Sequence, residues 1–260
     1  MAGKNNLKKS TAKRALTLLA LMATTPVSAA QFKALLFTKT AGWQHESIPA
    51  AVSAVTELSR LHDFETVHTD DSEAFTLENL QQFDVVVFLL TTGNVLNERQ
   101  QGAFQAFIRS GKGYVGVHSA ADTEYDWSWY RGLVGRNFLI HPAVQSAKVD
   151  VLETGFPGVE YMPARFLWTE EYYTYGPEHS DSLNYLLAVD ETTYKAQAAW
   201  GEVNSEGMGK FHPVAWYQQY DGGRAFYTGL GHLPASYGNA MFLSHLYGGI
   251  YWAATGKGID

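Results

Sequence analysis

The chain has 260 residues, of which 46% are hydrophobic and 17% charged, and this balance excludes intrinsic disorder as its main state. It contains no cysteine, which excludes disulfides, thiolate metal sites and a cysteine nucleophile. The formal net charge is −7, with 26 acidic and 19 basic residues.

Residues 1–30 have the layout of a secretory signal peptide. Five basic residues lie before the apolar run 15–25, and small residues follow at 26–30. The apolar run is too short to span a bilayer. We therefore expect cleavage after Ala29 or Ala30 and a periplasmic or secreted protein.

Removal of this segment makes the chain more acidic. All 26 acidic residues lie beyond residue 30, whereas five of the 19 basic residues precede it, so the mature charge falls to −12. Such a surface repels phosphate backbones, and we expect no nucleic-acid partner. No later stretch approaches eighteen apolar residues, so we expect no membrane association after signal removal; homo-oligomer formation is left open.

The first half of the mature chain alternates strand and helix patterns. Apolar strand patterns lie at residues 32–38, 64–68, 84–90 and 113–117, and helical patterns lie between them at 48–61, 76–83 and 97–109. Strands that are apolar on both faces predict a parallel sheet covered on both sides. The fold class expected is α/β, a flavodoxin-like, mostly parallel sheet with helices on both faces.

The alternation of strand and helix patterns ends after His118. Strand patterns lie at 143–152 and 185–189, a hairpin with an Asp-Gly turn joins 213–220 to 224–230, and a closing helix covers 240–254. No linker or repeat divides the chain. We therefore expect a single domain over residues 31–260, with an insertion around 123–211.

Polar side chains follow three of the predicted strands. In an open parallel sheet, ligands bind beyond the carboxyl ends of the strands. Trp43 and His45 follow the first strand, Thr92 follows the third, and His118 follows the fourth. The sequence around His118, GVHSA, has the strand–turn–helix pattern of a nucleophile elbow. A histidine held there can act as base, acid or ligand.

Further candidates lie in the second half. His212 and His232 flank the hairpin, whose second strand carries Arg224 and Tyr227. The predicted insertion carries His141 and the run Glu170-Glu171-Tyr172-Tyr173, which interleaves acids with aromatic rings as sugar sites often do. Asp122 follows the elbow, where it can orient His118 or cap a helix. Each of these residues also has a purely structural interpretation, such as a salt bridge for Arg224 or a core position for His232.

Metal and phosphate motifs are absent from the sequence. No histidines occur at the spacing of H-E-x-x-H, and no loop has the Walker or G-x-G-x-x-G pattern. We therefore expect no cofactor and assign no metal ligand. A metal site assembled from the distant His118, His212 and His232 stays open, because sequence cannot show it.

Several segments carry a family resemblance: residues 42–48, 91–93, 116–130, 133–142 and 212–232. Through them the chain resembles the ThuA-like (trehalose-utilisation) family from residue 32 to about 254. The fold of that family resembles class I glutamine amidotransferases, in which a cysteine occupies the place of His118. Glutamine hydrolysis through a thioester is therefore excluded here. Gln44 and Glu170 depart from the family pattern, which puts the ligand preference in question.

The resemblance implies a small carbohydrate substrate, a disaccharide or its oxidised 3-keto form. A ketone acidifies the neighbouring C–H bond, so a histidine can remove that proton, and elimination or isomerisation follows. We assign the base to His118, oriented by Asp122. Glu170 or Glu171 is expected to act as a second acid/base or to hold sugar hydroxyls. The donors to the enolate and the substrate-binding side chains are expected among His212, His232, Arg224, Trp43, His45, Thr92, His141 and Tyr227.

Two other functions fit the same residues. A non-catalytic sugar-binding protein would use the aromatic side chains without an acid/base pair, and a metal-dependent hydrolase would use the histidines as ligands. The enzyme hypothesis depends on one expectation, that His45, His118, His212 and His232 gather around a common cavity at one edge of the sheet.

Overall fold

The computed structural model describes residues 1–3 and 30–258 of the chain. Nearly all of the predicted signal peptide at 1–30 lies outside the described residues, so that expectation and the localisation derived from it stay predictions. Within the described part, none of the helices combines the length and the apolar character needed to cross a bilayer.

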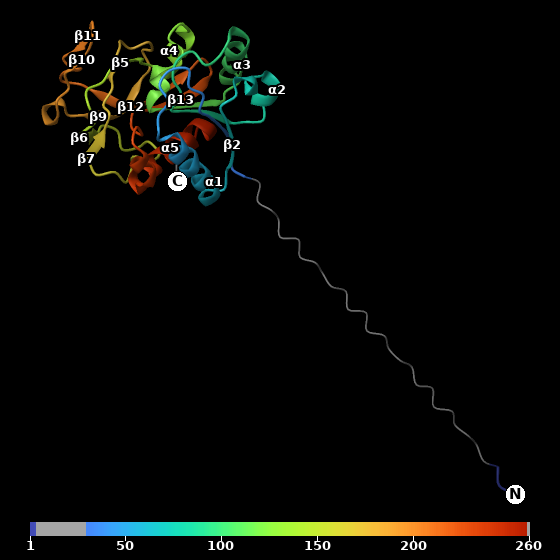
Figure 1. Ribbon diagram of the computed structural model, residues 1–260. Helices are drawn as coiled ribbons and strands as arrows, with labels where there is room; N and C mark the ends of the chain where they lie inside the picture. The colour runs from blue at the N-terminus through green and yellow to red at the C-terminus, as the bar shows by residue number, and fades with distance from the viewer. Residues whose placement is uncertain (4–29, 259–260) are drawn as a thin grey trace.

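The fold is built on one nine-stranded sheet with the order β2-β1-β3-β4-β13-β12-β9-β6-β7 (Figure 1). The first five of these strands run parallel: β2 (Glu65–Thr69), β1 (Lys33–Phe37), β3 (Val85–Leu89), β4 (Gly113–Val117) and β13 (Gly223–Thr228). The other four continue it in antiparallel pairs: β12 (Pro213–Tyr220), β9 (Asn184–Val189), β6 (Gln145–Val151) and β7 (Arg165–Glu170).

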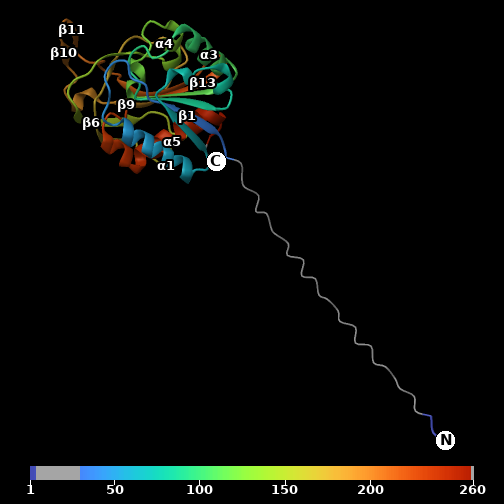
Figure 2. The same cartoon turned by 45° about the vertical axis from the view of Figure 1, so that its right-hand side comes forward.

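Helices cover both faces of the sheet. On one face lie α1 (Ile48–Leu61) and α5 (Ala240–Thr255); on the other lie α2 (Leu77–Leu80), α3 (Glu98–Arg109) and α4 (Ser128–Val134) (Figure 2). The strand β1 shows why both faces are apolar. Its residues Ala34 and Leu36 pack in the α1–α5 core, whereas Leu35 and Phe37 pack in the opposite core. The predicted α/β class is therefore confirmed.

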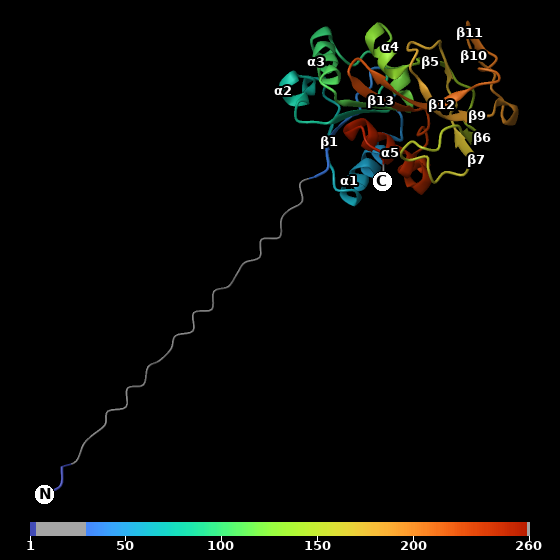
Figure 3. The ribbon, with the colours of Figure 1, turned by 180° about the vertical axis from the view of Figure 1, so that it is seen from behind.

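The antiparallel half is where the structure departs from the expected parallel layout. Residues 123–211 contribute β6, β7 and β9 to the main sheet, and the views from both sides show these strands at one end of it (Figure 3). Two small sheets also come from this region: β5 (Phe138–Ile140) with β8 (Thr174–Tyr175), and β10 (Ala198–Trp200) with β11 (Val203–Ser205). Strands of two or three residues carry too little periodicity to predict.

The glycine pair in α5 allows close packing rather than ending the helix. A methyl group at Gly249 would overlap the ring of Phe226 on β13, and one at Gly248 would overlap the backbone of Pro157. The helix α5 is continuous from Ala240 to Thr255, and Gly248 and Gly249 both lie where it contacts closely packed neighbours. The absence of a side chain therefore brings α5 against the sheet.

We predict that Gly249→Ala lowers the free energy of unfolding by about 1–3 kcal/mol, because the added methyl group displaces Phe226 or shifts α5. Urea unfolding followed by circular dichroism measures this change. The matched control is Gly102→Ala in α3, where the added methyl group meets nothing within 4 Å. That substitution should stabilise the protein by up to about 1 kcal/mol. Equal effects of the two substitutions would contradict the packing argument.

Candidate active site

Four side chains from distant parts of the sequence meet at one edge of the sheet. His45, His118, Glu171 and His232 each offer one nitrogen or oxygen atom, and these atoms all lie within 4.8 Å of one another. His45, His118 and His232 follow the carboxyl ends of β1, β4 and β13, and Glu171 follows β7. The four side chains therefore lie at the carboxyl-end edge of the sheet, where ligand sites are expected in a parallel sheet.

His118 has the backbone conformation expected of an elbow. It follows β4 directly, its φ is 49°, and its side chain is fully buried. Its Nδ1 lies 2.9 Å from the carbonyl oxygen of Gly229, and the Tyr227 hydroxyl donates a hydrogen bond to the His118 carbonyl at 2.7 Å. Because a carbonyl oxygen only accepts, Nδ1 carries the proton in the neutral ring. The Nε2 lone pair of His118 therefore faces the other members of the group.

The two other histidines are held neutral. Burial, with the imidazoles of His118 and His232 nearby, lowers the pKa of His45 to about 3. Burial and His118 lower the pKa of His232 to about 4. Burial alone would raise the pKa of Glu171, but its contacts with the imidazoles of His118, His141 and His232 outweigh burial and lower that pKa. At neutral pH the group therefore contains His45 and His232 as neutral imidazoles beside the ionised carboxylate of Glu171.

Glu171 connects this group to a further histidine. One carboxylate oxygen lies 3.4 Å from His118 Nε2 and 3.2 Å from His232 Nδ1, and the other lies 3.2 Å from His141 Nδ1. His141 Nδ1 is also 2.8 Å from the carbonyl oxygen of Pro142. Since both neighbours of this nitrogen are acceptors, the proton of neutral His141 lies on Nδ1 and its Nε2 presents a lone pair.

The group opens into a cavity of about 460 Å³. Its walls combine aromatic rings with titratable side chains: Trp43, His45, Asp122, Phe138, His141, Glu171, Tyr173, Trp200 and His232. Trp43 is 73% exposed, and the Trp200 ring stands edge-on to His141 at 4.5 Å between centroids. A concave site with apolar walls and a few convergent polar groups is the usual form of a small-molecule site.

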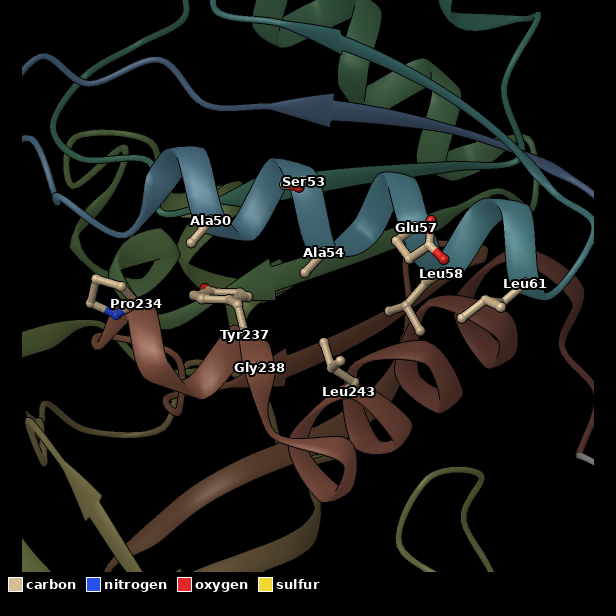
Figure 4. Close-up of a pocket in the computed structure, with 10 residues that line it drawn as sticks. All are labelled: Ala50, Ser53, Ala54, Glu57, Leu58, Leu61, Pro234, Tyr237, Gly238 and Leu243. Carbon is tan, nitrogen blue, oxygen red and sulfur yellow. The ribbon is translucent and has the colours of Figure 1, made fainter.

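A second hollow of about 410 Å³ has different chemistry. It lies between α1 and the segment formed by η4 (Pro234–Gly238) and α5, and Figure 4 shows Leu58, Leu61 and Leu243 facing it. Its carboxylate, Glu57, is paired with Arg60 on the same helix. This groove lacks the convergent histidines of the first cavity, so the first cavity is the candidate active site.

Three of the predicted site residues lie behind the cavity and support it. Thr92 accepts a hydrogen bond from the Gly42 amide and donates one to the Trp43 carbonyl at 2.8 Å, which holds the loop that carries Trp43. Tyr227 holds the elbow through the His118 carbonyl. Glu170 is fully buried, and its carboxylate accepts hydrogen bonds from the amides of Gly231, His232 and Glu171. These residues position others rather than line the cavity.

The structure places two predicted residues away from the cavity. His212 is buried behind the wall, where Nε2 lies 2.7 Å from the Tyr173 carbonyl and Nδ1 lies 2.7 Å from Glu191. Arg224 lies at the opposite edge of the sheet, where it donates to the carbonyls of Ala253 and Ala254 at the end of α5. The expectation that these two stabilise an enolate is therefore wrong, and the expected histidine group contains His45, His118 and His232 without His212.

Asp122 lines the cavity but does not orient His118. Its carboxylate accepts a hydrogen bond from the Tyr125 hydroxyl at 2.7 Å, while the Nδ1 of His118 is occupied by the Gly229 carbonyl. Burial raises the pKa of Asp122, and the Tyr125 bond and nearby histidines offset only part of that rise. Asp122 is therefore a cavity-facing carboxyl group with an increased tendency to hold a proton.

Two aromatic residues of the cavity wall, Phe138 and Trp200, are not among the residues predicted from the sequence. Phe138 lies on the short strand β5, and Trp200 ends the short strand β10. Phe138 falls within a segment that carries the family resemblance, but no spacing distinguished it. Tyr173 belongs to the run Glu170-Glu171-Tyr172-Tyr173, and its ring packs against Phe138 at 4.3 Å between centroids.

The fold and site define an α/β protein with a histidine–glutamate group at the carboxyl ends of its parallel strands. Residues 33–253 match the model of the ThuA family, described as trehalose utilisation. The chain therefore belongs to the ThuA trehalose-utilisation family, as the resemblance predicted. A search of curated proteins found no match to the chain.

Solved structures share the fold at low sequence identity. A putative ThuA-like protein from Bacteroides uniformis is 20% identical, with a TM-score of 0.72 over 91% of this chain and 98% of that one. A putative ThuA-like protein from Parabacteroides merdae is 19% identical, with a TM-score of 0.68 over 88% of this chain and 92% of that one. These similarities establish the fold and leave the reaction open.

We predict that Glu170→Gln destabilises the protein by about 1–3 kcal/mol, because a glutamine has one acceptor oxygen and turns its amide group toward backbone donors. Urea unfolding measures the loss. The matched control, Glu202→Gln, changes an exposed carboxylate and should leave the free energy of unfolding within about 0.5 kcal/mol of the wild type. An unchanged stability in Glu170→Gln would show that this carboxylate does not hold the loop of Gly231 and His232.

Proposed function

We propose that the protein is a sugar-active enzyme that acts on a carbonyl-bearing disaccharide, of which a 3-keto form of trehalose is the first to test. The observation that carries the proposal is the cavity itself, where aromatic rings face histidine and carboxyl groups. Its volume of about 460 Å³ falls in the usual range for small-molecule sites, about 300–1,000 Å³. The family description, trehalose utilisation, supports a sugar as the occupant.

The geometry favours His141 over His118 as the general base. His118 is fully buried and both ring nitrogens face protein atoms, so it cannot reach a substrate carbon. His141 lines the cavity, and Glu171 holds its Nδ1. Among the described residues, no hydrogen-bond partner lies at its Nε2. A histidine oriented by a carboxylate, with a lone pair available at the cavity, is the usual arrangement of a general base.

Asp122 supplies the complementary acid. In the proposed elimination, His141 Nε2 removes the proton from C2, next to the 3-keto group. The electron pair of that C–H bond forms the C1=C2 double bond as the C1–O glycosidic bond breaks. The leaving oxygen takes the proton of Asp122, whose pKa is raised by burial. The products are an enone and the free second sugar. If the C1–O bond stays intact, loss of the C2 proton gives an enolate, and return of a proton to the opposite face of C2 gives the C2 epimer, which is the isomerisation alternative.

We predict that His141→Ala and Asp122→Asn each lower kcat on 3-keto-trehalose by about 100-fold to 10,000-fold, the usual contribution of general acid–base catalysis. Glucose release and the ultraviolet absorbance of the enone measure the rate. The matched control is His179→Ala, which removes a half-buried imidazole that does not line the cavity.

Two outcomes would contradict the proposal. Wild-type protein that leaves 3-keto-disaccharides unchanged while binding them would favour a non-catalytic sugar-binding protein. Turnover that His141→Ala and Asp122→Asn do not slow would leave the substrate class standing and remove the assigned acid and base.

A further inference from the structure

In the His45–His118–Glu171–His232 group, the Nε2 of His118 and the Glu171 carboxylate present lone pairs to a common centre, where one ring nitrogen of His45 and one of His232 also converge. The Nδ1 proton of His118 is committed to the Gly229 carbonyl, so its Nε2 turns a lone pair toward Glu171 at 3.4 Å. Glu171 is a carboxylate, which has only acceptors. Unpaired lone pairs in a buried site repel one another, and protons or a cation at the centre would remove that repulsion.

The distances within the group match a metal coordination sphere. His118 Nε2, His232 Nδ1 and Glu171 Oε2 form a triangle with sides of 3.3, 3.2 and 3.4 Å. Tetrahedral ligands about 2.0–2.1 Å from a metal ion lie about 3.3–3.4 Å from one another. One ring nitrogen of His45 completes a set of four within 4.8 Å. The group therefore needs only a small movement of His45 to surround an ion.

The surrounding hydrogen bonds resemble those that orient metal-binding histidines. A ligand histidine usually donates its second ring N–H to a carbonyl or another fixed acceptor, which orients the coordinating nitrogen. His118 donates to the Gly229 carbonyl in this way, and His45 Nδ1 lies 3.4 Å from the Ser119 hydroxyl. The second oxygen of Glu171 is held by His141. Outer contacts therefore orient three of the four side chains toward the common centre.

We propose that His45, His118, Glu171 and His232 bind one divalent first-row transition-metal ion. Three imidazoles favour zinc, iron, cobalt, nickel or copper over calcium and magnesium, which prefer oxygen ligands, and the Glu171 carboxylate adds manganese to the candidates. The sequence could not assign this site, since the four ligands span residues 45 to 232 and no two adjoin in a ligand-spacing motif.

The site lies where an ion could meet a substrate. His45, Glu171 and His232 line the cavity, so an open coordination position would face it. An ion there would polarise a sugar carbonyl or hydroxyl. Binding of the ion requires only these four side chains and does not rest on the proposed substrate.

The test uses the full mature chain, stripped with a chelator and titrated with Zn²⁺ or Mn²⁺ alone. Calorimetry and elemental analysis are expected to give about one ion per chain, and the ion should raise the Tm. Glu171→Gln and His118→Ala should weaken binding by more than about 100-fold, the upper end of the effect of outer-shell substitutions. His179→Ala is the matched control and should bind as the wild type does.

Circular dichroism of each variant distinguishes weaker binding caused by the loss of a ligand side chain from weaker binding caused by unfolding. If His118→Ala does not fold, His232→Ala, whose side chain is 21% exposed at the cavity, takes its place. Less than a tenth of an ion per chain in the wild type, with both metals, would overturn the proposal. Unchanged affinity in folded Glu171→Gln and His232→Ala would overturn it equally. A protein that binds the ion but turns over no sugar would retain the metal site and reject the proposed reaction.

Discussion

The hydrogen bond between His118 Nδ1 and the Gly229 carbonyl is the interaction on which the site depends. It joins the loops after two neighbouring parallel strands, β4 and β13, and it fixes which ring nitrogen carries the proton. His118 has a left-handed backbone conformation, and the Tyr227 hydroxyl donates a hydrogen bond to the His118 carbonyl. Once Nδ1 is committed, Nε2 must face Glu171 and His232, so one backbone carbonyl determines the chemistry of the whole group.

The two carboxylate oxygens of Glu171 contact different parts of the site. One oxygen lies beside His118 and His232, where we propose the metal ion, and the other lies beside His141 at the cavity wall. The buried neighbour Glu170 supports this arrangement by binding the amides of Gly231 and His232. Two adjacent carboxylates thus have separate tasks, because one is enclosed by backbone donors and the other by imidazoles. A substrate carbonyl bound between the proposed metal ion and His141 would meet an electrophile on one side and a base on the other.

The parallel half of the fold follows from local patterns, and so does much of the site. Alternating strands and helices place Trp43, His45 and His118 at one edge, and the elbow pattern predicts the strained turn at His118. The same rule could have excluded Arg224, which begins its strand and must therefore lie at the opposite edge. No local pattern shows that His212 pairs with Glu191, or that Glu171 rather than Glu170 enters the group. Those outcomes depend on the packing of β7, β8 and the short strands, whose contacts join residues far apart in sequence.

The most direct test of this account is the tautomer of His118 in the chelator-treated protein, read from two-bond nitrogen–proton correlations of ¹⁵N-labelled histidine at neutral pH. Assignment by comparison with the His118→Gln variant identifies the signal. We expect the proton on Nδ1, where it faces the Gly229 carbonyl, and a free Nε2. A proton on Nε2 with Nδ1 unprotonated would contradict the orientation of the lone pairs, and with it both the metal site and the division of roles around Glu171.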